Sequence, residues 1–203
     1  MKVWAWAWTG WLVVVAGCGA SSSRPDQFQV EHSESVDVGG GPALPALTAD
    51  GLNPSMLGGG LTQDFSSTLQ NSGAQKGDVN SVMLTRLHLE VTAPLRNGAP
   101  LQDLRFLDSL SMSIKAAGLP EVTVAQSLAP STGAQSPSFG MGVFSVDIPV
   151  LGVELKDYAT ADSMDARVQV TANGRPGLSC TVKITTTLDV KLNPVGAARN
   201  RLF

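Results

Sequence analysis

Alternation of apolar and polar residues, repeated in short runs along most of the chain, is the feature that most constrains its fold. The clearest run is the last one. Its apolar positions are Cys180, Val182, Ile184, Leu188, Val190 and Leu192, and its polar positions are Thr181, Lys183, Thr185, Thr187, Asp189 and Lys191. Because successive side chains of a β-strand point to opposite faces, this run predicts a strand with one buried face and one face in water.

Earlier runs with the same period predict the other strands. They lie at Phe28–Val38, Leu87–Val91, Leu110–Ala116, Val122–Val124, Phe144–Val150 and Ala166–Ala172. His32 and Glu34 interrupt the first run, which leaves one strand or two shorter ones open. Pro149 predicts an edge strand or a strand end, because proline cannot donate to a sheet. The turn-forming residues 173–177 (NGRPG) predict a hairpin between the last two strands.

Helical patterning is confined to the connections. Residues 39–80 are the least regular part of the chain, with glycine triplets at 39–41 and 58–60 that we expect in loops. Within this segment Leu61, Phe65 and Leu69 recur every four residues, which predicts a short helix over 62–71. Two further connections, 101–107 and 153–158, have locally helical patterns.

Short strands with one apolar face must pack on another layer to bury that face. We therefore predict an all-β fold, an antiparallel two-sheet sandwich with one or two short helices in its connections; a barrel is the open alternative. A chain of 203 residues suits one such domain with a leader and a tail. We assign the sandwich to residues 27–192, with an irregular glycine-rich segment at 39–80 and a C-terminal tail at 193–203.

The first residues differ in composition from the rest. All four tryptophans (Trp4, Trp6, Trp8 and Trp11) lie there, and Lys2 precedes an apolar run from Val3 to Ala16. This run is shorter than the roughly 20 apolar residues that a membrane-spanning helix needs, and it suits a signal peptide. It ends in Val15-Ala16-Gly17-Cys18, and small polar residues follow.

In these residues the chain resembles the precursors of bacterial lipoproteins, whose lipobox is an aliphatic residue, two small residues and a cysteine. The resemblance implies lipidation of the Cys18 thiol and cleavage between Gly17 and Cys18. Residues 1–17 would then be the signal peptide and 18–26 a lipidated tether. Two or more acyl chains hold a protein stably on a membrane, at about 0.8 kcal/mol per buried methylene. An ordinary signal peptide, cut after Ala20, is the alternative.

Two further expectations come from resemblance. In lipoproteins of this kind an aspartate after the cysteine often signals retention in the inner membrane. Because Gly19 occupies that place, the outer membrane is favoured if the host has one. The strand pattern of the mature chain broadly resembles the immunoglobulin-like sandwiches of exported bacterial lipoproteins.

The remaining cysteine, Cys180, has no partner for a disulfide once Cys18 carries lipid. It falls on the apolar side of the last strand, where a free cysteine behaves as a small hydrophobe. We predict a buried, inert thiol; a reactive thiol is the alternative.

Motifs for chemistry are absent from the sequence. His32 and His88 have no histidine or cysteine at metal-ligand spacing, and we expect them to be structural or surface residues. There is no G-x-S-x-G elbow. Asp157, Asp162 and Asp165 form the one acidic cluster, but their spacing matches no calcium loop. They are weak metal candidates and suit a solvated connection better, so we expect no catalytic residue, no metal and no cofactor.

These observations favour a non-enzymatic, lipid-anchored cell-envelope protein. Its net charge is −3, with charges scattered singly, which argues against nucleic-acid binding. We expect it to bind a membrane through the lipid on Cys18 and an envelope protein or glycan through loops, with Asn53–Asn80 the prime segment. A carrier of a small molecule or lipid between the sheets is the alternative, and a hydrolase that uses His32 or His88 is less expected.

Overall fold

The computed structural model describes residues 26–39, 58–127, 139–161, 164–172 and 176–193. Its strands are β1 (Gln27–Val38), β2 (Val79–Ala93), β3 (Leu95–Arg96), β4 (Ala99–Pro100), β5 (Leu107–Ala116), β6 (Val122–Gln126), β7 (Ser145–Ile148), β8 (Met164–Ala172) and β9 (Cys180–Leu192). Its helices are α1 (Gly58–Asn71), the single 3-10 turn η2 (Lys76–Asp78) and α2 (Lys156–Thr160). No helix within these ranges has both the length and the apolar composition to span a bilayer.

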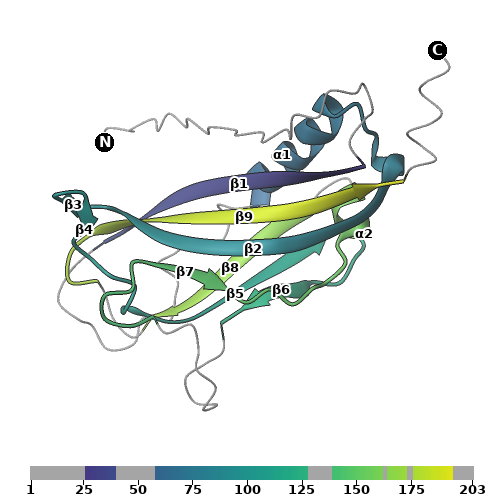
Figure 1. Ribbon diagram of the computed structural model, residues 1–203. Helices are drawn as coiled ribbons and strands as arrows, with labels where there is room; N and C mark the ends of the chain where they lie inside the picture. Colours follow the sequence, from purple (N-terminus) through teal and green to yellow (C-terminus); the bar gives the residue numbers. More distant parts are fainter. Residues whose placement is uncertain (1–25, 40–57, 128–138, 162–163, 173–175, 194–203) are drawn as a thin grey trace, which may run out of the picture.

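The strands form two antiparallel sheets that face each other (Figure 1), so the predicted all-β, two-sheet architecture is confirmed. One sheet has the order β1-β9-β2-β7 and the other β6-β5-β8, while β3 and β4 form a small separate hairpin. The first strand pairs with the last, whereas immunoglobulin domains place their first strand beside the second. The likeness to such domains is therefore one of architecture, not of strand order.

The core lies between the two sheets. Apolar side chains of β2 and β9 face those of β5 and β8, and many of them are completely buried. They include Leu87, Leu89, Leu110, Met112, Ile114 and Leu188, each at most 2% exposed. Such burial is what the alternating pattern predicts, because each sheet has only one apolar face.

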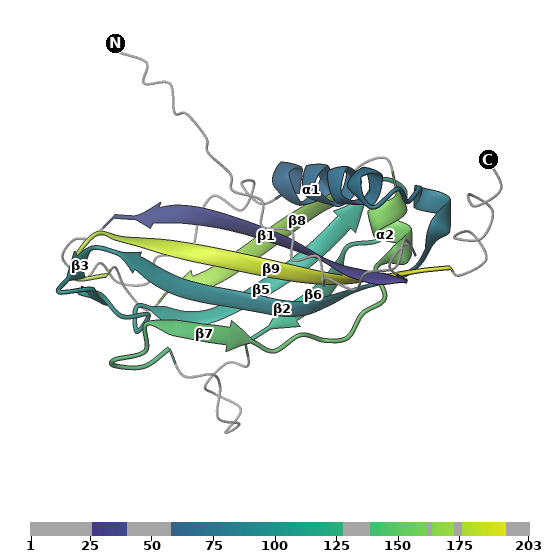
Figure 2. The same cartoon turned by 45° about the horizontal axis from the view of Figure 1, so that its top comes forward.

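Helix α1 covers the side of the sandwich where β1 and β8 are the edge strands (Figure 2). Phe65 and Leu69, 1% and 3% exposed, anchor it. The predicted helix over 62–71 is therefore confirmed, but it begins earlier. The glycines at 58–60, expected in a loop, form its first turn, since packing of the later turns outweighs the weak helix propensity of glycine.

A glycine ends this helix. Gly73 has φ +67°, its N–H donates to Gln70 O at 2.9 Å, and the Ala74 N–H donates to Leu69 O at 2.8 Å. These are the two hydrogen bonds of a Schellman cap, which requires a residue in the left-handed conformation. β2 then begins at Val79, so the irregular segment assigned to 39–80 is too long.

The chain closes the opposite side of the sandwich by crossing from one sheet to the other. β7 is an edge strand and ends at Ile148, directly before Pro149, as the missing N–H of proline predicts. The next residues pair with β6: the Gln126 N–H donates to Pro149 O, and the Leu151 N–H donates to Val124 O at 2.8 Å.

The first run, which the sequence left open as one strand or two, forms one continuous strand, β1. Two local predictions need correction. β8 and β9 are not a hairpin, because β8 pairs with β5 and β9 pairs with β1 and β2 in the other sheet. Residues 101–106 form turns and not a helix, because their side chains hydrogen-bond to neighbouring loops. The predicted helix near 153–158 is confirmed as α2.

Candidate functional site

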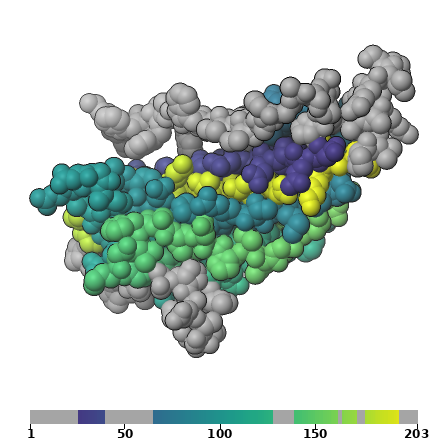
Figure 3. Space-filling view, viewed as in Figure 1, coloured from purple at the N-terminus to yellow at the C-terminus, as the bar shows by residue number. Residues whose placement is uncertain are grey.

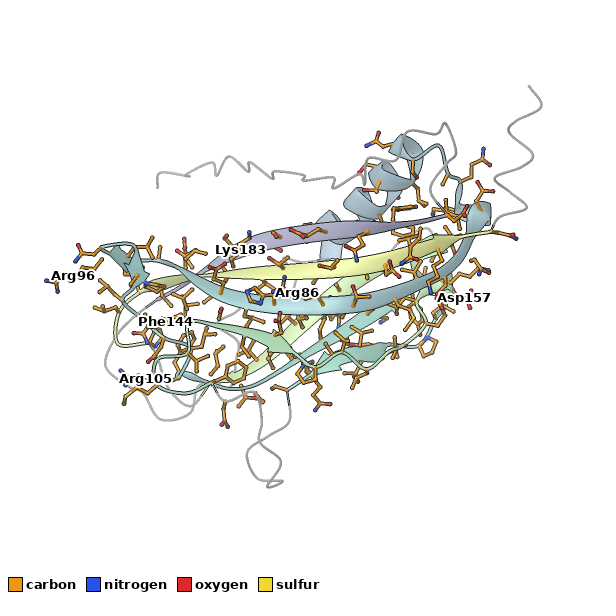
Figure 4. All side chains as sticks on the ribbon, in the orientation of Figure 1. Arg86, Arg96, Arg105, Phe144, Asp157 and Lys183 are labelled. Carbon is orange, nitrogen blue, oxygen red and sulfur yellow. The ribbon has the colours of Figure 1, made fainter. Side chains whose placement is uncertain are left out.

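One end of the sandwich exposes large apolar side chains on three separate segments. They are Leu95 (54% exposed), Leu101 (46%), Met141 (83%), Phe144 (37%) and Leu178 (50%). We call these five residues the apolar tip. Figure 4 shows Phe144 at this end together with Arg96 and Arg105, far from Asp157 at the opposite end.

Backbone and side-chain hydrogen bonds hold these segments together. The Leu101 N–H donates to Pro94 O at 2.9 Å, and the Leu104 N–H donates to Val143 O at 2.8 Å. The buried Gln102 accepts from the Leu178 N–H at 3.2 Å through its Oε1. These bonds join the β3–β4 hairpin, the segment before β7 and the segment before β9 into one surface.

The β3–β4 hairpin projects Leu95 and Arg96 from this surface. Its two-residue turn is Asn97-Gly98, with φ of 52° and 81°. Positive φ at both positions is what a tight type I′ turn requires, and Asn-Gly is its preferred sequence. The turn therefore fixes the register in which Leu95 faces Pro100.

Arg96 and Arg105 lie at this end (Figure 4), and the nearby Asp37, beside Thr181 at the end of β1, accepts from Thr181 Oγ1 at 2.7 Å. Asp103, whose side chain is only 11% exposed, lies 3.2 Å from Arg105 Nε through one oxygen. Its other oxygen accepts from the Gly142 N–H at 2.9 Å. Among the described residues Arg96 forms no ion pair. The tip thus combines apolar side chains with arginines, and its one carboxylate near Arg105 is turned inward.

A second group of polar residues crosses the outer face of the four-stranded sheet, which faces the viewer in Figure 3. Ser33, Thr185, His88 and Asp147 lie in one row across β1, β9, β2 and β7. Ser33 Oγ lies 2.9 Å from Thr185 Oγ1, and His88 Nδ1 lies 2.8 Å from Asp147 Oδ1.

Arg86 completes this group. Its Nε donates to Asp147 Oδ1 at 2.8 Å, and this bond lowers the pKa of Asp147 and raises that of Arg86. His88 Nδ1 lies 2.8 Å from Asp147 Oδ1, which can only accept, and 3.2 Å from Arg86 Nη2, which can only donate, so which of the two it pairs with is set by the tautomer of the ring. The Arg86 and Asp147 side chains are 51% and 61% exposed, and an ion pair so open to water contributes little to stability.

The row resembles a hydroxyl–imidazole–carboxylate arrangement only in composition. In the described residues no hydrogen bond joins His88 to Thr185 or Ser33, so no hydroxyl is positioned for activation. The backbone N–H groups of central strands point within the sheet and not out of its face, where an oxyanion would need them. The geometry suits a charged, solvated surface.

Glu34 is buried on the inner face of β1. It is 8% exposed, and neither carboxylate oxygen has a hydrogen-bond partner among the described residues. Burial raises its pKa, while the neighbouring His32 opposes that shift. This is the position where polar residues interrupt the apolar pattern of the first strand.

The other predicted residues are placed as follows. Cys180 is 4% exposed and unpaired, as predicted, and burial raises its pKa to about 11. Asp157 is exposed in α2 and Asp165 in β8, while Asp162, Gly17 and Cys18 lie outside the described residues. Within the described ranges no three His, Cys, Asp or Glu side chains gather as metal ligands.

The apolar tip was not found by sequence reasoning. Asn97-Gly98 between Leu95 and Leu101 is a hairpin signal and could have been recognised. Nothing in the sequence, however, shows that three segments so far apart meet at one end.

Comparisons with known proteins do not assign this chain to a family. No family model matches the chain, and no curated protein matches it. Among solved structures, one of turnip yellow mosaic virus at 100 K has 14% identity and a TM-score of 0.24, over 83% of this chain and 95% of that chain. A likeness so distant carries no argument about function.

Proposed function

We propose that this protein is a lipid-anchored component of the bacterial cell envelope, whose β-sandwich binds a partner and performs no chemistry of its own. The observation that carries the proposal is the sequence Val15-Ala16-Gly17-Cys18 at the end of a short apolar leader. The lipid on Cys18 would hold the domain at the membrane. The outer membrane is favoured where the host has one, because Gly19 follows the cysteine.

The folded domain supports a binding role through its loops. The apolar tip exposes hydrophobic side chains to water, which is energetically unfavourable. Exposed hydrophobic patches on otherwise polar proteins mark interaction sites. It is a better candidate than Asn53–Asn80, because α1 in that segment uses Phe65 and Leu69 to close the core.

The anchor is tested by metabolic labelling of the full chain with a fatty acid in a bacterial host. The wild type should incorporate label and partition into membranes, and Cys18→Ser should do neither. Cys180→Ser is the matched control, because it makes the same substitution at a cysteine that is buried in the fold. Label retained by Cys18→Ser would contradict the anchor, and an unlabelled wild type released in soluble form would favour cleavage after Ala20.

A further inference from the structure

We propose that the apolar tip is a docking site for another envelope protein, one that presents an apolar surface bordered by acidic side chains. The choice of an envelope protein rests on the proposed function. The surface itself does not, because it follows from the exposed side chains and charges of the described residues.

The composition of the tip fits a protein interface. Leucine, methionine and phenylalanine side chains 37–83% exposed lie on one surface with two arginines. Aromatic residues, methionine and arginine are enriched in the buried centres of protein–protein interfaces, and lysine, aspartate and glutamate are depleted there. Met141, at 83% exposed, has the most apolar area to lose on docking.

The charges select the partner. Arg96 has no ion pair with a described residue, and Arg105 lies beside the inward-facing Asp103. A facing surface with carboxylates would pair with Arg96 and suppress docking in other orientations. A glycan fits less well, because the amide of Gln102 and the carboxylate of Asp103, which could hydrogen-bond to sugar hydroxyls, already bind Leu178 and Gly142.

The position of the tip favours a protein over the anchoring membrane. The chain enters the sandwich at Gln27, opposite Lys191, and β1 ends at Val38, opposite Cys180. The tip adjoins this second end, since Ala93 and Thr181 are partners just before β3. The 12 residues of β1 separate the two ends by about 40 Å at about 3.4 Å per residue.

The tether adds to this separation. Residues 19–26 lie between Cys18 and Gln27, and a chain of this length spans at most roughly 30 Å. A domain anchored through Cys18 and standing on its entry end would present the tip up to roughly 70 Å from the bilayer surface. The tip would thus reach partners away from the anchoring membrane.

The test is site-specific photo-crosslinking in living cells. A photoreactive amino acid replaces Leu95, Met141 or Leu178 in the full-length chain, and Leu151 as a control. Leu151 is exposed to the same extent as Leu95, 52% against 54%, but it lies beyond β7 where the chain pairs with β6. We expect the same envelope protein, identified by mass spectrometry, from all three tip positions and not from Leu151.

Variants then test the chemistry. Met141→Asp and Arg96→Glu should each lower crosslinking from Leu95 by about tenfold, as expected for residues at the centre of an interface. Leu151→Asp should leave it unchanged. Circular dichroism of each variant shows whether the fold is intact. Loss of crosslinking in Met141→Asp but not in Arg96→Glu would contradict the proposal that the partner presents acidic side chains.

Crosslinks to other kinds of molecule would overturn the proposal as a whole. Crosslinks to lipid, together with binding of the full chain to vesicles of phosphatidylethanolamine and phosphatidylglycerol, would make the tip a membrane-docking site. Crosslinks to a second copy would make it a site of self-association, and no crosslink above the Leu151 background would leave no docking site. Fatty-acid labelling reports the anchor separately, so failure of the tip and failure of the proposed function are distinguishable.

Discussion

The buried carboxylate of Glu34 lies in an environment that is unfavourable to its own charge. Its carboxylate is buried on the inner face of β1 and has no hydrogen-bond partner in the part of the chain that the structure describes, and burial raises its pKa above the ordinary value of 4.5. The charged form is therefore more stable in the unfolded chain than in the fold. Stability from this group is fully present below its ordinary pKa and is lost as the pH rises through the raised pKa of the folded state.

Glu34→Gln should therefore stabilise the protein at neutral pH. We expect a gain of about 1 kcal/mol in the free energy of unfolding near pH 7, because the uncompensated charge is removed. The gain should disappear near pH 4, where both states carry the protonated acid. Urea denaturation at both pH values measures the difference, and equal stability of the two proteins near pH 7 would refute the assignment.

A second carboxylate, Glu154, shows the opposite behaviour. Burial alone would raise its pKa, but hydrogen bonds from Ser81 Oγ, the Val82 N–H and the Lys156 N–H lower it below its usual value. The Ser81 and Val82 donors lie 2.6 and 2.8 Å away, and Lys156 opens α2. Glu154 thus joins β2 to the start of α2.

Glu154→Gln should destabilise the protein. We expect a loss of about 1 kcal/mol near pH 7, since a partly exposed carboxylate loses charge-assisted hydrogen bonds. A depressed pKa supplies stability above the unfolded pKa, so the loss should shrink as the pH falls below about 4. The matched control is Glu121→Gln, whose carboxylate accepts, among the described residues, from Ser113 Oγ alone. A smaller effect at Glu154 than at Glu121 would contradict this reading.

Among the strands, the predictions were correct where the alternation of apolar and polar residues continues without interruption. They were wrong where a bulge shifts that alternation. In β2 the buried residues are Leu84 and then Leu87, and the register shifts between Leu84 and Arg86. This bulge turns Arg86 and His88 to the outer face. A strict alternation cannot extend through it, which is why the sequence predicted only Leu87–Val91 of a strand that begins at Val79.

The hairpin error has a related cause. Turn residues after β8 predict that the chain reverses, and alternation shows which side of each strand is apolar. Neither signal tells whether the returning strand pairs with its predecessor or crosses to the facing sheet. In this fold β9 crosses and becomes a central strand between β1 and β2. The apolar tip depends on the same long-range arrangement, so the candidate site was harder to predict than the fold.

Helix α1 should contribute much of the stability of the side it covers. Phe65→Ala removes a side chain that is 1% exposed and should cost about 3–5 kcal/mol in the free energy of unfolding. Gln70→Ala, at an exposed position of the same helix, is the control and should change stability by less than about 0.5 kcal/mol. Comparable losses in the two variants would show that α1 is not packed as described.

At the scale of the whole molecule, the two sheets share one core and should unfold together. Residues of both sheets belong to a single buried cluster, in which Leu188 lies in one sheet and Met112 in the other. Neither sheet can bury its apolar face away from water without the other. A small domain built this way is expected to unfold in one cooperative transition.

Cys180 supplies the probe for this prediction. Its thiol is 4% exposed, and a pKa of about 11 against the ordinary 9.0 leaves little thiolate in the fold. Labelling by a thiol reagent near pH 8 therefore requires opening of the structure. In Cys18→Ser, which leaves Cys180 as the single thiol, both Leu188→Ala and Met112→Ala should increase the opening equilibrium about thirtyfold or more, since each loses about 2–5 kcal/mol. Acceleration by Leu188→Ala alone would mean that the four-stranded sheet opens independently. No acceleration by either would mean that Cys180 is reached by local fraying at the start of β9, and that the sandwich is not a single cooperative unit at its tip.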